Sequence, residues 1–179
     1  DRAPATTGVG GFPAATGIRN GRSSGARSAA EDLAWVARVD VTPVEGLMLG
    51  ASLYNGEADQ GMNDFSGENV SVTLWEAHAK GEFRGLEAKA LYTEGRIGNA
   101  AGVNRAQSIV AASGGSVGSR LFGGYLEVAF NALSLLPTKN YLAPFYRYER
   151  YDTQLRTPAT YAKNPANSRV EHVVGVTYK

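Results

Sequence analysis

The chain has 179 residues, a formal net charge of +1 and no cysteine. This near-neutral charge argues against a general attraction to nucleic acid, and the lack of cysteine excludes disulfides, thiol nucleophiles and cysteine-ligated metals. The sequence holds no run of about 18 apolar residues, so no transmembrane helix is expected. The 22 glycines favour tight turns and closely packed strands over helices.

Residues 1–30 differ in composition from the rest of the chain. They are rich in glycine, serine and arginine and have no hydrophobic period, which is typical of a loop or an unpaired N-terminal segment. Over residues 31–179, apolar and polar side chains alternate with a period of two almost to the end. This part is therefore predicted to consist of β-barrel strands and loops.

The alternation predicts seven strands, in the order Asp32–Thr42, Leu47–Asn55, Val70–Phe83, Leu86–Gly95, Ser119–Asn131, Tyr141–Thr153 and Arg169–Lys179. A tilted strand needs about 9–11 residues to cross a bilayer, whereas strands of globular proteins have about 5–6. The predicted strands match the longer class.

The connections between these strands alternate between short and long. Short connections follow the first, third and fifth strands, while the segments 56–69, 96–118 and 154–168 are long and rich in polar or small residues. Outer-membrane barrels have this asymmetry, with brief periplasmic turns and extended extracellular loops. The sequence therefore predicts an all-β fold, an antiparallel transmembrane β-barrel in the bacterial outer membrane.

In such a barrel the charged face of each strand lines a water-filled lumen and the apolar face meets lipid. A soluble barrel has the opposite arrangement, and periodicity alone does not separate the two. The many alanines of the apolar face favour lipid, because a soluble core of such small residues would pack poorly. The pore-lining candidates on the charged face are Arg38, Asp40, Glu76, His78, Lys80, Glu87, Lys89, Glu127, Arg147, Glu149 and Glu171.

Aromatic side chains near strand ends are typical of the girdles at membrane interfaces. The alternation places Tyr54 and Tyr141 at such ends as well. Ordinary core aromatics are the alternative interpretation. The membrane-interface candidates are Trp35, Trp75, Phe83, Tyr92, Phe130, Tyr146, Tyr148 and Tyr178.

Catalytic and metal-binding signals are weak. His78 and His172 lie far apart without a nucleophile motif, so neither an enzyme nor a cofactor is expected. The run Glu57-x-Asp59-x-Gly61-x-Asn63-Asp64 has calcium-like spacing but lacks the twelve-residue loop pattern. No metal site is predicted from it.

An odd number of strands cannot close a single-chain bacterial barrel, and open edges in lipid leave backbone groups without partners. Either residues 1–30 add a strand, or the 179 residues are a fragment of a larger barrel. The second interpretation is favoured.

Two stretches resemble a known family. They are DLAWVARVDVTPVEGLMLGASLYNG over residues 32–56, and GGYLEVAFNALSLL with YLAPFYRYERYDTQ within residues 123–154. Both are hairpins that resemble the C-terminal half of outer-membrane porins related to the phosphate-selective porin O/P family. The resemblance implies a barrel of about sixteen or more strands with a water-filled pore, and assembly as a homotrimer.

The predicted function is a passive, porin-like channel for small hydrophilic or anionic solutes, in contact with the lipid bilayer and lipopolysaccharide and with no nucleic-acid partner. Acidic residues outnumber basic ones on the charged face, so phosphate selectivity is not expected. Two alternatives stay open: a structural barrel or sheath around a partner protein, and a soluble β-barrel that binds a ligand inside.

Overall fold

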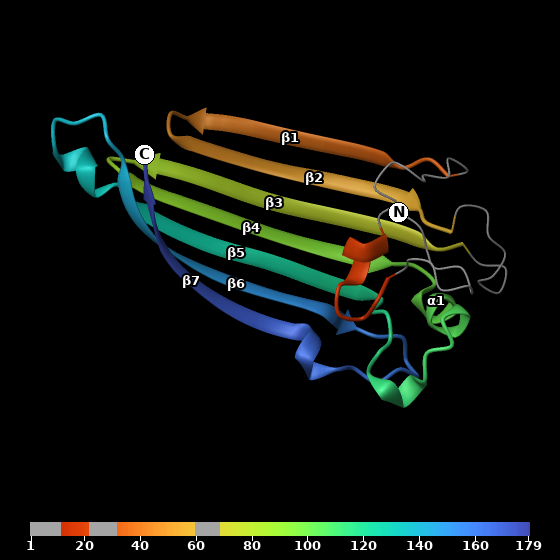
Figure 1. Cartoon of the computed structure of the whole chain (residues 1–179). Helices are drawn as coiled ribbons and strands as arrows, with labels where there is room; N and C mark the ends of the chain where they lie inside the picture. Colours follow the sequence, from red (N-terminus) through yellow and green to blue (C-terminus); the bar gives the residue numbers. More distant parts are fainter. Residues whose placement is uncertain (1–11, 22–31, 60–68) are drawn as a thin grey trace.

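The computed structural model describes residues 12–21, 32–59 and 69–179. Seven strands form one antiparallel sheet in which each strand pairs with its neighbours in sequence (Figure 1). Their bounds are β1 (Trp35–Val44), β2 (Leu47–Glu57), β3 (Ser71–Phe83), β4 (Leu86–Ile97), β5 (Arg120–Phe130), β6 (Leu142–Arg156) and β7 (Ser168–Tyr178). Within the described residues the sheet is not closed, and β1 and β7 are its edges.

The predicted all-β, antiparallel class is confirmed, with small corrections at the strand ends. Strand β1 begins at Trp35 rather than Asp32, and β6 continues to Arg156, beyond the predicted end at Thr153. The tight turns after β1 and β3 depend on Gly46 and Gly85, both at φ 82°. Glycine adopts this left-handed backbone without the steric cost of a Cβ, so the hairpins turn where the sequence predicts.

The two ends of the sheet differ. At the short-turn end, β5 and β6 are joined by a connection with one 3-10 turn, η4 (Ala132–Leu135). The opposite, long-loop end carries helix α1 (Ala100–Ala106) and the 3-10 turns η1 (Gly17–Gly21), η3 (Ala111–Ser113) and η5 (Pro165–Asn167). No helix of the described residues is long and apolar enough to cross a membrane.

Helix α1 lies in a segment for which the sequence predicts only a long loop. Its N-cap is Asn99, whose side chain accepts a hydrogen bond from the Gly102 backbone N–H. The helix has only seven residues and is rich in alanine and glycine. The sequence therefore shows no amphipathic period from which this helix could be predicted. Its stability comes from packing, because isolated helices of this length are not stable in water.

Buried hydrophobic side chains gather at the long-loop end rather than along the sheet. The cluster consists of Phe12, Ile18, Ala58, Val70, Val72, Ile97, Ala100, Val103 and Val117. Along the remaining sheet, large apolar side chains stay exposed, for example Val39 at 65% and Val174 at 77%. These apolar side chains of the sheet are therefore not covered by the other described residues.

Candidate functional site

Cross-strand pairing gives the sheet one apolar and one charged face. Successive side chains on a strand point to opposite faces, and directly paired residues share a face. One row of the apolar face runs through Val41, Leu49, Ala79, Ala90 and Leu126 on β1 to β5. The row next to it on the charged face includes Lys80, Lys89, Glu127 and Arg147.

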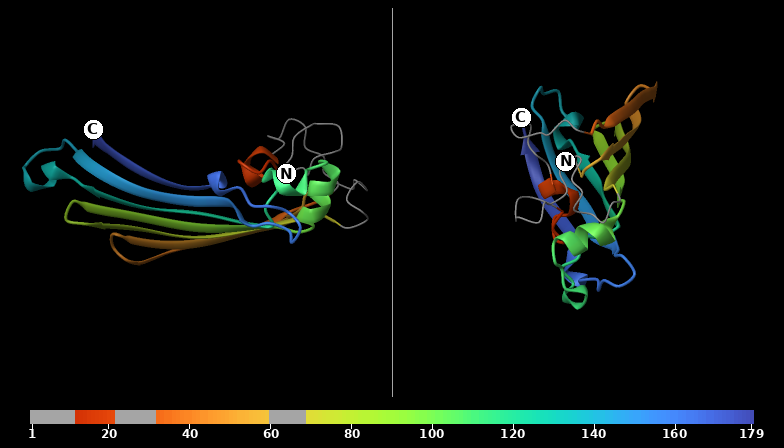
Figure 2. Two further views of the ribbon diagram at one scale, coloured as in Figure 1. Left: turned by 90° about the horizontal axis from the view of Figure 1, so that it is seen from below. Right: turned by 90° about the vertical axis from the view of Figure 1, so that its right-hand side faces the viewer.

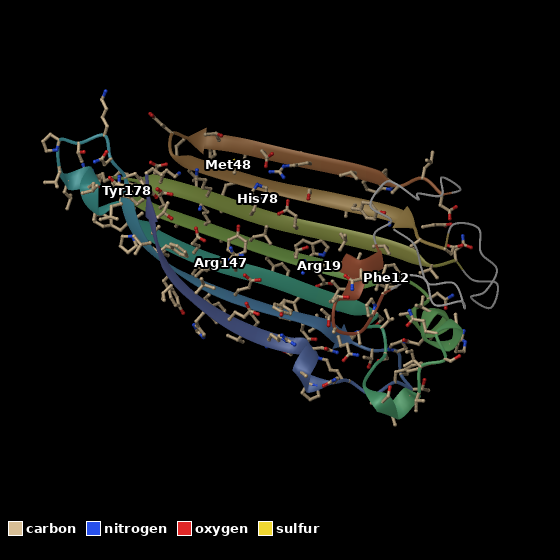
Figure 3. The ribbon with its side chains drawn as sticks, viewed as in Figure 1. Phe12, Arg19, Met48, His78, Arg147 and Tyr178 are labelled. Carbon is tan, nitrogen blue, oxygen red and sulfur yellow. The ribbon has the colours of Figure 1, made fainter. Side chains whose placement is uncertain are left out.

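All eleven side chains predicted to line a pore lie on the charged face, and Figure 3 labels His78 and Arg147 among them. They are Arg38, Asp40, Glu76, His78, Lys80, Glu87, Lys89, Glu127, Arg147, Glu149 and Glu171. The sheet curves around this face (Figure 2). That these residues line a pore stays a prediction, and it is taken up in the proposal below.

A first network of polar contacts connects β1, β2 and β3. The Arg38 guanidinium contacts Asp40 at 2.7 Å, and Asp40 lies 3.0 Å from Nε2 of His78. The other ring nitrogen of His78 lies 3.0 Å from Glu76. The contact between β1 and β3 passes above Gly50 of β2, where an added Cβ would overlap both Asp40 and the His78 ring. A glycine is therefore required for these side chains to meet.

A second network connects β4, β5 and β6. Glu127 accepts from Lys89 at 2.8 Å and lies 4.0 Å from Arg147, which also contacts Glu149 at 2.8 Å. The Arg147 guanidinium stacks 3.9 Å from the centre of the Tyr125 ring. Half-exposed ion pairs of this kind contribute little stability individually, but together they orient the charges of the face.

Between the two networks, Lys80 on β3 and Lys89 on β4 are direct cross-strand partners. Two like charges in this position repel each other. No ion pair of Lys80 is found among the described residues, whereas Lys89 is held by Glu127. Both lysines border a hollow of about 400 Å³ that Arg38 and His78 also line. Among the four basic side chains predicted to line a pore, Lys80 is therefore the one without an ion pair in the contacts described.

Near the short-turn end, Tyr141 donates a hydrogen bond of 2.6 Å to Glu87. This bond raises the pKa of the Tyr141 phenol to about 12. The interaction also corrects the sequence interpretation of two aromatics, because Tyr141 faces Glu87 and Tyr54 packs with Leu74 near the buried cluster. Neither belongs to the apolar face, since Tyr54 pairs with Leu74 on the charged side and the Tyr141 hydroxyl bonds to Glu87 on the same side.

At the long-loop end, the side of the sheet that elsewhere carries the charged networks has apolar side chains instead. Residues 12–21 cover these side chains. Tyr54, Leu74 and Leu121 pack there against a cluster that includes Phe12 and Ile18, which are 0% and 8% exposed. Thr153 of β6 donates a hydrogen bond to the Ala14 carbonyl. Residues 12–21 contain a 3-10 turn, and their packing into the sheet was not predicted.

The loops at this end are held together by buried side-chain amides. Gln154 is 0% exposed, and its Nε2 donates to the carbonyls of Gly114 and Ser116 at 3.0 Å and 2.6 Å. Its Oε1 accepts from the backbone N–H of Asn164. One side chain therefore joins the β4–β5 and β6–β7 connections. Sequence reasoning missed it, since a glutamine at a strand end is usually solvated.

The eight predicted interface aromatics all lie on the apolar face, as the register shows. Toward the long-loop end, the ring centroids of Trp75 and Tyr92 are 5.3 Å apart, and the Tyr92 ring stacks on that of Phe122. Phe83 and Tyr178 lie at the short-turn end. Tyr148 is in a middle row, beside Leu126 and His172. Their placement at membrane interfaces stays a prediction.

Three carboxylates near the β2–β3 connection come close together. Single oxygens of Asp32, Glu57 and Asp59 lie within 4.8 Å of one another. Glu57 accepts from Asn69, and Asp59 accepts from the Val70 backbone N–H. These hydrogen bonds join residues 57–59 to residues 69–70, where the β2–β3 connection begins and ends. The remainder of the calcium-like run, residues 61–64, lies outside the described residues.

Comparisons with known proteins leave the family open. No family model matches the chain, and no solved structure matches it. The chain is similar to an uncharacterized protein of Aquifex aeolicus (strain VF5), with 26% identity over 173 residues. The match covers 94% of this chain and 38% of that protein, so the chain spans well under half the length of this relative.

Proposed function

We propose that this chain forms part of an outer-membrane β-barrel that acts as a passive channel for small hydrophilic or anionic solutes. The observation that carries the proposal is the separation of the two faces. An apolar surface extends across all the strands, and the opposite surface holds charged side chains in two networks. Membrane barrels need this arrangement, with lipid outside and water inside.

Exposure of the apolar face supports lipid as its surroundings. Val39, Val174 and Val176 are 65%, 77% and 63% exposed. Each Å² of apolar surface left in water costs about 25 cal/mol relative to burial. Lipid removes this cost without demanding a close-packed partner, and it accommodates the small alanine side chains of β3 and β4 equally well.

The free edges of β1 and β7 support a larger barrel. Backbone groups without partners cost several kcal/mol each in lipid. Further strands would therefore have to pair with both edges, which agrees with the greater length of the Aquifex aeolicus relative. A barrel of about sixteen or more strands, as the porin resemblance implies, would provide them.

The charged face favours weak selectivity over a dedicated site. Three of the four basic side chains predicted to line the pore are already paired with carboxylates: Arg38 with Asp40, Lys89 with Glu127 and Arg147 with Glu149. Small hydrophilic solutes would pass such a wall without binding tightly. Lys80, which has no ion pair in the contacts described, is a side chain through which an anion would be favoured.

Planar bilayers test the proposal directly. The protein, purified in detergent from the outer-membrane fraction, should give stepwise conductance at constant voltage. Failure to conduct would contradict the channel. A second polypeptide enclosed by the barrel would instead support a sheath, and solubility without detergent would support a soluble ligand-binding barrel.

Lys80→Glu should shift the reversal potential in a salt gradient toward cation preference, because a fixed charge in the wall attracts counter-ions. Lys139→Glu, in the exposed connection between β5 and β6, is the matched control and should leave the reversal potential nearly unchanged. An equal shift in both variants would contradict a pore lined by the charged face.

A further inference from the structure

A group of charged side chains interrupts the apolar face at its long-loop end. Arg96 of β4 and Arg120 of β5 are direct cross-strand partners, and both contact the same oxygen of Glu94. Arg150 of β6 lies with its guanidinium 5.7 Å from the centre of the Phe122 ring. We call Arg96, Arg120 and Arg150 the arginine patch.

The carboxylate of Glu94 positions the first two arginines. Its side chain is 7% exposed, whereas the side chains of Arg96 and Arg120 are 62% and 31% exposed. Arg120 reaches Glu94 through Nε and Nη2 at 3.0 Å and 2.6 Å. One carboxylate beneath two guanidiniums neutralises a single charge and leaves N–H groups of Arg96 directed to the surface. A guanidinium in a fixed orientation matches the oxygens of a phosphate group.

The patch has a surplus of positive charge. Arg150 is exposed and has an aromatic contact, but no carboxylate forms an ion pair with it in the part of the chain that the structure describes. The neighbouring Asp152 is paired with Lys163 at 2.8 Å and does not compensate it. The side chains around Glu94 and Asp152 therefore carry two positive charges more than negative ones.

Aromatic and apolar side chains lie directly beside the patch. Trp75 pairs with Glu94 across β3 and β4, and Phe122 pairs with Glu94 across β4 and β5. From Tyr92 toward the short-turn end, the apolar face on β2 to β5 carries no charged side chain. A molecule that fits this surface has an anionic head and apolar chains, in this order along the strands.

We propose that the arginine patch binds the phosphate groups of a phosphorylated glycolipid of the lipopolysaccharide type, whose acyl chains lie on the apolar face. This inference rests on the proposed function and specifies one lipid partner and its site. Long loops of outer-membrane barrels are extracellular, which places the patch at the outer leaflet. Charge complementarity selects the phosphorylated head over a neutral lipid.

The short-turn end offers a matched comparison. Arg84 lies 5.2 Å from the centre of the Phe83 ring, so it also combines a guanidinium with an exposed aromatic. It has no second arginine across the strand and no carboxylate to orient it among the contacts described. A single cation of this kind lacks the fixed, multiple donors of the arginine patch.

The test measures binding of fluorescent diphosphoryl lipid A to the purified protein in neutral-detergent micelles by fluorescence anisotropy. The unmodified protein should bind it at least about tenfold more tightly than the dephosphorylated lipid, because charge-assisted hydrogen bonds to phosphate are lost in the latter. Equal binding of the two lipids would overturn the proposal, and this comparison needs no variant.

The triple variant Arg96→Gln, Arg120→Gln, Arg150→Gln should lose the preference for phosphate, while Arg84→Gln should retain it. Retention by the triple variant, or equal loss in Arg84→Gln, would overturn the location of the site. Heat-modifiable migration in gels checks that each variant is folded. Conductance in neutral-lipid bilayers should be unchanged in the triple variant, so a failure of the channel proposal is recognised separately in the unmodified protein.

Discussion

The long-loop end and the body of the sheet are stabilised in different ways. At the long-loop end, residues distant in sequence pack into a buried cluster and share buried hydrogen bonds. In the body, backbone pairing between sequence neighbours dominates, and both faces remain open. One end of this sheet therefore has its own small core, whereas the remainder depends on its surroundings. Substitutions at matched positions test this contrast.

Phe12→Ala should have the largest effect. The side chain is fully buried, and removal of a buried phenylalanine costs about 3–5 kcal/mol. Residues 12–21 should detach from Leu121 and Thr153 while the sheet stays paired. Limited proteolysis should then cleave near this segment much faster than in the unmodified protein.

Phe83→Ala is the matched control, because Phe83 is 69% exposed on the apolar face at the opposite end. It should leave the proteolysis rate near residue 12 unchanged. Similar rates for the two variants would show that the buried cluster does not hold the segment.

Gln154→Ala should have an intermediate effect. It leaves the Gly114 and Ser116 carbonyls and the Asn164 N–H without their partner. Unsatisfied buried groups cost about 1–3 kcal/mol. Amide hydrogen exchange in the β4–β5 and β6–β7 connections should become faster, whereas exchange in the β1–β2 hairpin should not. The half-exposed Gln107, changed to alanine, should alter neither region.

Gly50→Ala should have the smallest effect. The new methyl group overlaps Asp40 and His78, but both side chains can rotate away, so the loss is about 1 kcal/mol, at the low end for overpacking. A Cβ at Gly81 on β3 meets nothing within 4 Å. The denaturant midpoint in detergent should fall for Gly50→Ala and not for Gly81→Ala. Equal midpoints would mean that the contacts above Gly50 do not stabilise the sheet.

Much of the sheet could be predicted because its pattern is local. A period of two determines which side chains share a face, and Gly46 and Gly85 mark two hairpins. The packing of residues 12–21 could not be predicted, since the bond between Thr153 and Ala14 joins residues 139 apart. The role of Gly50 on β2 also depends on side chains of β1 and β3, which no single strand reveals.

Pairing of every strand with its sequence neighbours has a consequence for assembly. Each hairpin closes a short stretch of chain, so its entropic cost is small, and contacts that are local in sequence form early. The sheet can therefore grow hairpin by hairpin, each new strand using the last as its template. Docking of residues 12–21 closes a far longer loop, to β6. It should be the final step, completed only after the β5–β6 hairpin has created the surface that receives it.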